Sequence, residues 1–407
     1  MPYYRRVGEV PRKRHIRFER PDGGLHSEEL MGVDGFSADS ALLYHRRPPT
    51  AIVKAEAVDE STAAVEVAAN RPLLPRHLRT HALPAGGDAV AGRRLLLAND
   101  DVRLLIAAPA AGPGGVSELY RNATGDELVY VESGSATLES VYGALEVRAG
   151  DYVVIPTSTT HRWVPAGPGA PGGPGVSPGE SGLRLLVLEA RGHVRPPRRY
   201  LSPAGQFLEH SPYCERDLRA PAEPLLVDDG ETPVLVRTRD GLTRYTYLHH
   251  PFDVVGWDGC LYPWAFNIGD FEPIVGRLHQ PPPVHQTFEG PNFVVCSFVP
   301  RLFDFHPEAV PVPYNHANVD SDEVLFYVGG DFMSRKGSGI GLGSISLHPA
   351  GFIHGPQPGS VEAATGKPGT DEVAVMVDTF RPLGLGPAAR ETEDPEYAWT
   401  WARGLDR

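Results

Sequence analysis

Two stretches of this chain repeat one arrangement of glutamate, glycine, proline and histidine, and this repeat restricts the possible folds most. The first stretch reads DELVYVESG and then GDYVVIPTSTTH, and the second reads DEVLFYVGG and then GSISLHPAGFIH. Six residues separate Glu127 from Gly134, and six separate Glu323 from Gly330. A proline stands five positions before His161 and likewise before His354. A repeated supersecondary unit explains this economically, so we expect two copies of one domain.

Short apolar runs between turn residues indicate that both copies are built from strands. Runs such as DVRLLIAAP, DELVYVESG and NFVVCSFVP recur along the chain, and its 45 glycines and 41 prolines suit turns better than long helices. We expect a fold dominated by β-structure, with two β-sandwich or barrel domains. Residues 1–90 are predicted to form an irregular N-terminal arm with packing segments. Residues 91–215 are predicted to form the first domain, and residues 216–407 the second domain with a C-terminal tail.

Composition excludes several classes of protein. A formal net charge of −13 argues against nucleic acid as a partner, because phosphate binding needs basic faces. Neither an export signal nor an apolar run of about 18 residues is present, so we expect no membrane span and a cytoplasmic location. The three cysteines are too widely spaced for a disulfide framework. Residues 165–182 are rich in glycine and proline and are expected to form a surface loop without chemistry.

The second copy carries a candidate metal site. Side chains two residues apart share one face of a strand, so His316 and Asn318 point the same way before a turn reverses the chain into the strand of Glu323. Antiparallel neighbours place His316 close to Glu323, and His354 returns inward from a later hairpin. Two imidazoles and one carboxylate leave half of an octahedral iron open. Asp322 is an alternative ligand, although the pleat turns its side chain to the other face.

The same residues carry a resemblance to a known family. HxN, four residues, Glu, six residues and Gly, followed by GxxxxxPxGxxH, is similar to the two motifs of cupins. Together with VVGW, PYxH and SxxLHxxxxxHGP, residues 250–360 resemble homogentisate 1,2-dioxygenase. The resemblance implies a bicupin whose second domain holds Fe(II) on His316, Glu323 and His354. It also implies a small aromatic substrate, O2 as co-substrate and a homo-oligomer based on trimers.

Family members have an upstream histidine that acts on the bound phenol and a supporting histidine behind the metal ligands, which stands before the last ligand in the sequence. The resemblance assigns the first role to His279 in RLHQPPPVHQTF, with His285 as a competitor, and the second role to His348. It implies a hydroquinone-type phenol whose ring is opened by dioxygen at the metal without an external reductant.

The substrate side departs from the family. Gly329 and Phe332 stand where better-known members have an arginine and a tyrosine, and either Arg335 or Lys336 is a candidate substitute. Two alternatives therefore stay open. One is the same chemistry on another dihydroxyarene in secondary metabolism, and the other is a non-redox metal cupin acting as an isomerase, a lyase or a ligand binder.

The first copy lacks most of the metal ligands. Tyr120 and Asn122 occupy the histidine positions of its motif, which leaves only Glu127 and His161. One carboxylate and one imidazole bind iron poorly, so this copy is predicted to be metal-free.

Overall fold

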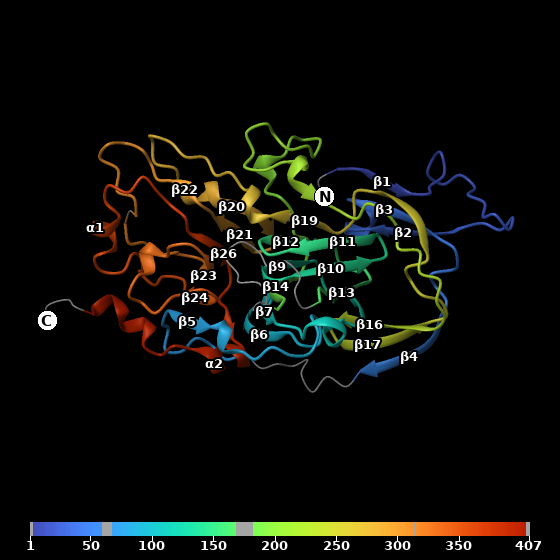
Figure 1. Ribbon diagram of the computed structural model, residues 1–407, viewed down its shortest axis with the longest axis horizontal. Helices are drawn as coiled ribbons and strands as arrows, with labels where there is room; N and C mark the ends of the chain where they lie inside the picture. Colours follow the sequence, from blue (N-terminus) through green and yellow to red (C-terminus); the bar gives the residue numbers. More distant parts are fainter. Residues whose placement is uncertain (1–2, 59–66, 168–181, 313, 404–407) are drawn as a thin grey trace. The chain divides into compact units, whose positions relative to one another are not determined.

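A computed structural model describes residues 3–58, 67–167, 182–312 and 314–403 (Figure 1). Strands dominate it, and the α-helices α1 (Ser360–Ala364) and α2 (Pro387–Thr392) are short, which confirms the prediction of a fold dominated by β-structure. The loop predicted at residues 165–182 lies almost wholly outside the described residues. In the described part of the chain, no helix has the length and apolar character that a membrane crossing needs.

The chain forms two compact units, and each takes up three stretches of sequence. The first unit contains residues 1–64, 85–93 and 107–267, and the second contains residues 65–84, 94–106 and 268–407. These boundaries differ from the predicted ones at 90/91 and 215/216, because strand pairing outweighs order along the chain. For example, β16 (Thr232–Thr238) pairs with β8 (Leu119–Asn122) in the first unit, and β5 (Arg76–Arg79) pairs with β24 (Ser344–His348) in the second.

Three sets of neighbouring strands make up the first unit. Their orders are β1-β18-β3-β2, then β11-β10-β13-β8-β16-β17-β4, and then β15-β19-β12-β9-β14. The remaining bounds are β1 (Arg5–Gly8), β2 (Ser27–Gly32), β3 (Ser40–His45), β4 (Ile52–Val58), β9 (Glu127–Ser133), β10 (Ser135–Ser140), β11 (Gly143–Arg148), β12 (Asp151–Ile155), β13 (His161–Pro165), β14 (Arg184–Ala190), β15 (Leu218–Arg219), β17 (Gly241–Tyr247), β18 (Val254–Gly259) and β19 (Trp264–Asn267). Its 3-10 turns are η1 (Asp34–Phe36), η3 (Gly112–Gly115), η4 (Arg198–Tyr200) and η5 (Glu215–Asp217).

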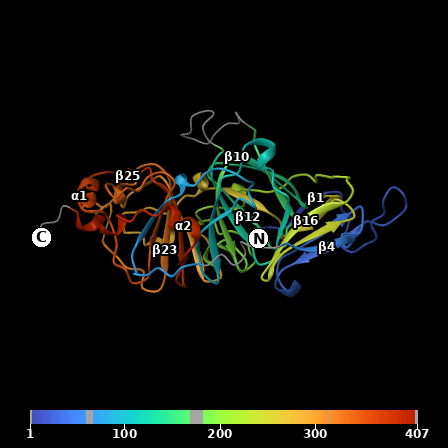
Figure 2. The ribbon, with the colours of Figure 1, turned by 90° about the horizontal axis from the view of Figure 1, so that it is seen from below.

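The second unit is built on the six-stranded sheet β20-β21-β26-β23-β24-β5. Strands β6 and β7 pair with each other, as do β6 and β27, and β22 and β25. The bounds are β6 (Arg94–Ala98), β7 (Val102–Ala107), β20 (Gln286–Gly290), β21 (Phe293–Phe298), β22 (Arg301–Leu302), β23 (Asp322–Gly329), β25 (Gly369–Thr370), β26 (Val373–Thr379) and β27 (Gly384–Leu385). Figure 2 shows β23 among the strands of this unit, which also has the 3-10 turns η2 (Thr80–Ala82), η6 (Ile268–Asp270), η7 (Pro282–His285), η8 (Met333–Arg335) and η9 (Tyr397–Ala402).

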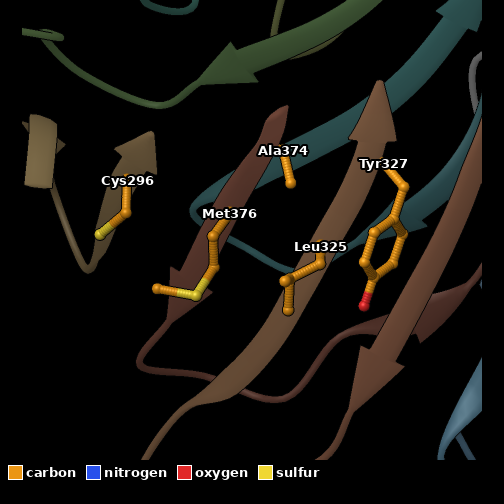
Figure 3. Packing of buried hydrophobic residues seen from close by; sticks show 5 residues of the cluster. All are labelled: Cys296, Leu325, Tyr327, Ala374 and Met376. Carbon is orange, nitrogen blue, oxygen red and sulfur yellow. The ribbon is translucent and has the colours of Figure 1, made fainter. Parts of the chain in front are cut away.

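One face of this sheet carries an apolar cluster that fixes the register of β23. Leu325 lies opposite Met376 and Tyr327 opposite Ala374, and Cys296 of β21 completes the cluster (Figure 3). Burying a leucine or methionine side chain stabilises a fold by about 1.5–3 kcal/mol, so slippage of β23 would be costly. Because side chains alternate along a strand, Glu323 shares this face and its position is fixed with the cluster.

Candidate metal centre

His316 and His354 face each other across a short antiparallel bridge in the second unit. The backbone N–H of each donates to the carbonyl oxygen of the other, both at 2.8 Å, and the ring centroids lie 4.3 Å apart. Glu323 lies at the start of β23 beside them. The bridge thus brings together two histidines that lie far apart in sequence, as the motif spacing predicted.

The donor atoms of the three residues converge. Nε2 of His316 lies 3.6 Å from Oε2 of Glu323, and Nε2 of His354 lies 3.3 Å from Oε1 of Glu323. One ligand atom from each residue fits within a 4.8 Å cluster. His354 is buried, and its Nδ1–H donates to the carbonyl of Phe352 at 3.0 Å. Its Nε2 finds no hydrogen-bond partner among the described residues, so this nitrogen is free to bind a cation.

The alternative ligand Asp322 has another use. Its Oδ1 accepts from the backbone N–H of Ala350 and its Oδ2 from that of Leu383, both at 2.8 Å. Asn318, which stands where many cupins have a histidine, donates through Nδ2 to Asp378 at 3.4 Å. The acid of the cluster is therefore Glu323. Although burial alone would raise the pKa of Glu323, the neighbouring imidazoles of His316, His348 and His354 hold it well below its usual range.

His348 supports the cluster from behind. Its Nδ1 lies 2.9 Å from Oε1 of Glu323, and its ring stacks on that of His354 at 4.1 Å. Burial, together with the positive charge of Arg335, lowers the pKa of His348 to about 3. His348 is therefore neutral, with a proton on Nδ1 that it donates to the carboxylate. His348 thus holds the carboxylate of Glu323, and its supporting role at a metal stays a prediction.

A cavity of about 340 Å³ opens beside the donor cluster and brings both predicted acid–base candidates to it. Nδ1 of His279 lies 2.6 Å from Oδ2 of Asp304, and its Nε2 lies 3.2 Å from the hydroxyl of Tyr314. The ring is half exposed, so it can exchange protons with a bound molecule and with solvent. The sequence offered no signal for Asp304, because the hydrogen bond depends on a loop conformation.

His285 also lines the cavity, but its surroundings suppress its charge. Its ring packs on Phe298 with centroids 4.6 Å apart. Burial and the charge of Arg301 lower the pKa of His285 to about 3. A ring that cannot hold a proton near neutral pH is a poor proton carrier. The geometry therefore favours His279 over His285 for acid–base work.

Arg335, rather than Lys336, lines this cavity, as Arg301 also does. Arg335 is only 6% exposed. Its Nε donates to the hydroxyl of Tyr327 at 3.0 Å, and its Nη1 donates to the carbonyl of Gly355 at 2.7 Å. Among the described residues it forms no ion pair. Phe332 packs on Tyr327 instead, with ring centroids 5.1 Å apart, and neither it nor Gly329 is among the cavity residues.

The equivalent position in the first unit is arranged differently. Glu127 and His161 are buried, and the ring of His161 meets that of Tyr120 at 5.6 Å. Like His354, His161 donates from Nδ1 to a backbone carbonyl, that of Thr159 at 3.0 Å, and its Nε2 has no partner among the described residues. The repeat seen in the sequence thus extends to the orientation of this ring.

A guanidinium lies among these residues. Nη1 of Arg93 lies 2.8 Å from Oε1 of Glu127 and 2.9 Å from Oε1 of Glu189, and Nη2 lies 2.9 Å from Oε2 of Glu127. The group stacks over the Tyr120 ring at 5.5 Å, and Asn122 donates to Glu127 at 3.0 Å. Burial alone would raise the pKa of Glu127, but the neighbouring Arg93 lowers this pKa to about 2. Arg93 thus provides the positive charge at the position where a cupin would hold a metal.

Replacing Arg93 by methionine should strongly destabilise the first unit. The change leaves two buried carboxylates without their cation, and breaking a buried pair costs about 3–5 kcal/mol of unfolding free energy. Denaturant unfolding with a chelator present measures this loss. Arg244→Met, which removes an exposed ion pair to Glu118, is the matched control and should cost under about 1 kcal/mol. Equal losses for the two variants would contradict the role given to Arg93.

Comparison with known proteins decides the family. A family profile described as "Cupin domain" matches residues 111–171. A protein of Saccharolobus solfataricus described as "Putative dioxygenase" is 41% identical over 405 residues, which cover 98% of this chain and 99% of that protein. The chain belongs to the cupin family. It groups there with the Saccharolobus protein.

More distant relatives of this cupin are described as homogentisate 1,2-dioxygenases. The protein of Emericella nidulans is 26% identical over 316 residues, covering 71% of this cupin and 66% of the relative. That of Nitrobacter hamburgensis is 26% identical over 309 residues, covering 72% and 64%. The cupin thus spans about two thirds of these relatives. A solved cupin barrel protein from Leptotrichia buccalis is 9% identical, and the match covers 78% of this chain and 98% of the Leptotrichia protein. Its TM-score is 0.33, so this likeness adds nothing to the family assignment.

Proposed function

We propose that this cupin is an Fe(II)-dependent dioxygenase that cleaves the ring of homogentisate or a related hydroquinone. The carrying observation is the convergence of donor atoms from His316, Glu323 and His354 within 4.8 Å, beside a cavity that His279 also lines. Two neutral imidazoles and one carboxylate are the donor set of non-haem Fe(II) oxygenases. Iron bound there would supply Lewis acidity and a meeting place for phenol and dioxygen.

The chain's own groups would prepare the phenol. A substrate hydroxyl within reach of Nε2 of His279 can pass its proton to that nitrogen, while Asp304 holds Nδ1–H at 2.6 Å and stabilises the imidazolium that forms. Phe298, Leu325 and Met376 give the cavity an apolar wall against which an aromatic ring can pack. Residues that line the cavity would thus bind the ring, orient it and move its proton.

Arg335 supports a substrate with an acidic side chain. A buried guanidinium without a carboxylate partner is costly unless an anion completes its surroundings. A carboxylate on the substrate would provide that anion on the cavity side of Arg335. Arg335 would then replace the substrate contacts that Gly329 and Phe332 cannot make, because neither residue lines the cavity.

The deciding experiment is an oxygen-electrode measurement. Reduced protein loaded anaerobically with ferrous iron should consume one O2 per homogentisate and form an absorbing ring-opened product. Protein loaded with zinc should not. If iron-loaded protein is inert to every hydroquinone while zinc-loaded protein catalyses a non-redox reaction, the cupin is an isomerase or lyase instead.

Arg335→Met should change which hydroquinones are used. Loss of a charge-assisted hydrogen bond costs about 1.5–3 kcal/mol, which corresponds to about 10–150-fold in kcat/KM. The ratio of kcat/KM for homogentisate to that for neutral 2,5-dihydroxytoluene should fall by this factor. Lys336→Met, on an exposed neighbour outside the cavity, is the control and should leave the ratio unchanged. An unaltered ratio in Arg335→Met would favour the second candidate function, the same chemistry on another dihydroxyarene.

We also propose, on the family resemblance, a cytoplasmic protein that assembles from trimers. Light scattering coupled to size-exclusion chromatography measures the assembly directly. A monomeric mass would remove that part of the proposal without affecting the site.

A further inference from the structure

The C-terminal tail reaches the back of the metal centre. The hydroxyl of Tyr397, in η9, lies 2.9 Å from Nε2 of His348, and both side chains are fully buried. No motif in the sequence points to a chemical role for this tail. The Tyr397 ring packs 5.2 Å from that of Trp401 and 5.5 Å from that of His77, but its hydroxyl lies one hydrogen bond from the histidine that holds Glu323.

The hydrogen bonds continue from His348 to the metal centre. Nδ1 of His348 lies 2.9 Å from Oε1 of Glu323, so Tyr397, His348 and Glu323 are joined by two consecutive hydrogen bonds.

The carboxylate fixes the direction of both bonds. A carboxylate can only accept, so Nδ1–H of His348 donates to Glu323. A neutral imidazole has a single N–H, so Nε2 of His348 accepts and the hydroxyl of Tyr397 donates to it.

We propose that Tyr397 is a positioning residue for the metal centre, which it organises through directed hydrogen bonds to His348 and from His348 to Glu323. The proposal rests on the proposed function only in taking His316, Glu323 and His354 as metal ligands. By donating to Nε2, Tyr397 keeps the His348 proton on Nδ1, where it holds Oε1 of Glu323. Without that donor the imidazole can take the other tautomer, which presents a lone pair to the carboxylate and releases it.

Tyr397→Phe tests this, because phenylalanine keeps the ring packing and removes only the hydroxyl. We expect the affinity for Co(II), measured by competition with a chelator, to fall about 10–100-fold. The visible absorption bands of bound Co(II) should shift as well. Tyr142→Phe is the matched control, because Tyr142 is a buried tyrosine of the first unit whose hydroxyl contacts the sulfur of Met31 at 3.3 Å. This variant should bind Co(II) like the wild type.

A double-variant cycle separates positioning from packing. If Tyr397 acts through His348, then adding Tyr397→Phe to His348→Gln should reduce Co(II) affinity no further. Additive losses, or unchanged affinity in Tyr397→Phe, would overturn the proposal. His348→Gln alone should weaken Co(II) binding about as much as Tyr397→Phe, which provides a second test if Tyr397→Phe does not fold. Wild-type protein that binds no Co(II) would instead refute the ligand assignment itself.

Discussion

His354→Ala should lose both its iron and its turnover. The variant removes a buried imidazole whose Nε2 has no protein partner among the described residues, and His316 with Glu323 alone forms an incomplete site. Metal polarisation contributes several kcal/mol to such reactions, and each 1.36 kcal/mol is tenfold in rate. O2 consumption should therefore fall by about 10³-fold or more. Elemental analysis after anaerobic loading with Fe(II) measures the metal retained.

A control for this variant is available in the same unit. His306 is exposed, and its Nδ1 only accepts from the backbone N–H of Glu308 at 3.1 Å. His306→Ala should retain a full complement of iron and wild-type turnover. An iron content in His354→Ala equal to that of the control would refute the ligand assignment.

His279→Ala should keep its iron and lose rate. The side chain lines the cavity but lies outside the donor cluster, so metal content should not change. Positioned acid–base groups contribute about 10²–10⁴-fold, and kcat for homogentisate should fall by that factor. Stopped-flow absorbance under single-turnover conditions separates this chemical loss from weaker binding.

Two further variants sharpen the test. Asp304→Asn keeps an acceptor oxygen for Nδ1–H but removes the charge that stabilises the imidazolium, so its loss should be smaller than that of His279→Ala. His285→Ala should lower kcat less still, because the pKa of His285, about 3, keeps it neutral throughout the working range. If His285→Ala proves the slower enzyme, the two assignments must be exchanged.

The spacing of the motif residues predicted the three candidate metal ligands, but not the residues that contact the site from loops and the tail. Spacing along strands follows from the pleat, so His316, Glu323 and His354 could be placed together from the sequence. Asp304, Tyr314 and Tyr397 reach the site from loops and the tail, whose conformations no periodicity encodes. Arg335 could not be separated from Lys336 by sequence, because the choice depends on which side of a 3-10 turn faces the cavity.

The fold class was equally accessible, whereas the division into units was not. Alternating apolar runs and turn residues mark strands locally, and the strands formed. Which strands pair depends on long-range contacts. The sequence gives no local sign that β5 joins the sheet of β24, or that β16 lies beside β8.

Arg93 has a consequence for how the protein tolerates metal shortage. A cation that is part of the polypeptide cannot be removed by a chelator, exchanged for another metal or lost by oxidation. The folding equilibrium of the first unit should therefore not depend on the supply of metal. Only the second unit would respond to iron starvation. If the second unit holds iron as proposed, a first unit that stays folded without metal would give the apoprotein a framework on which activity could be restored.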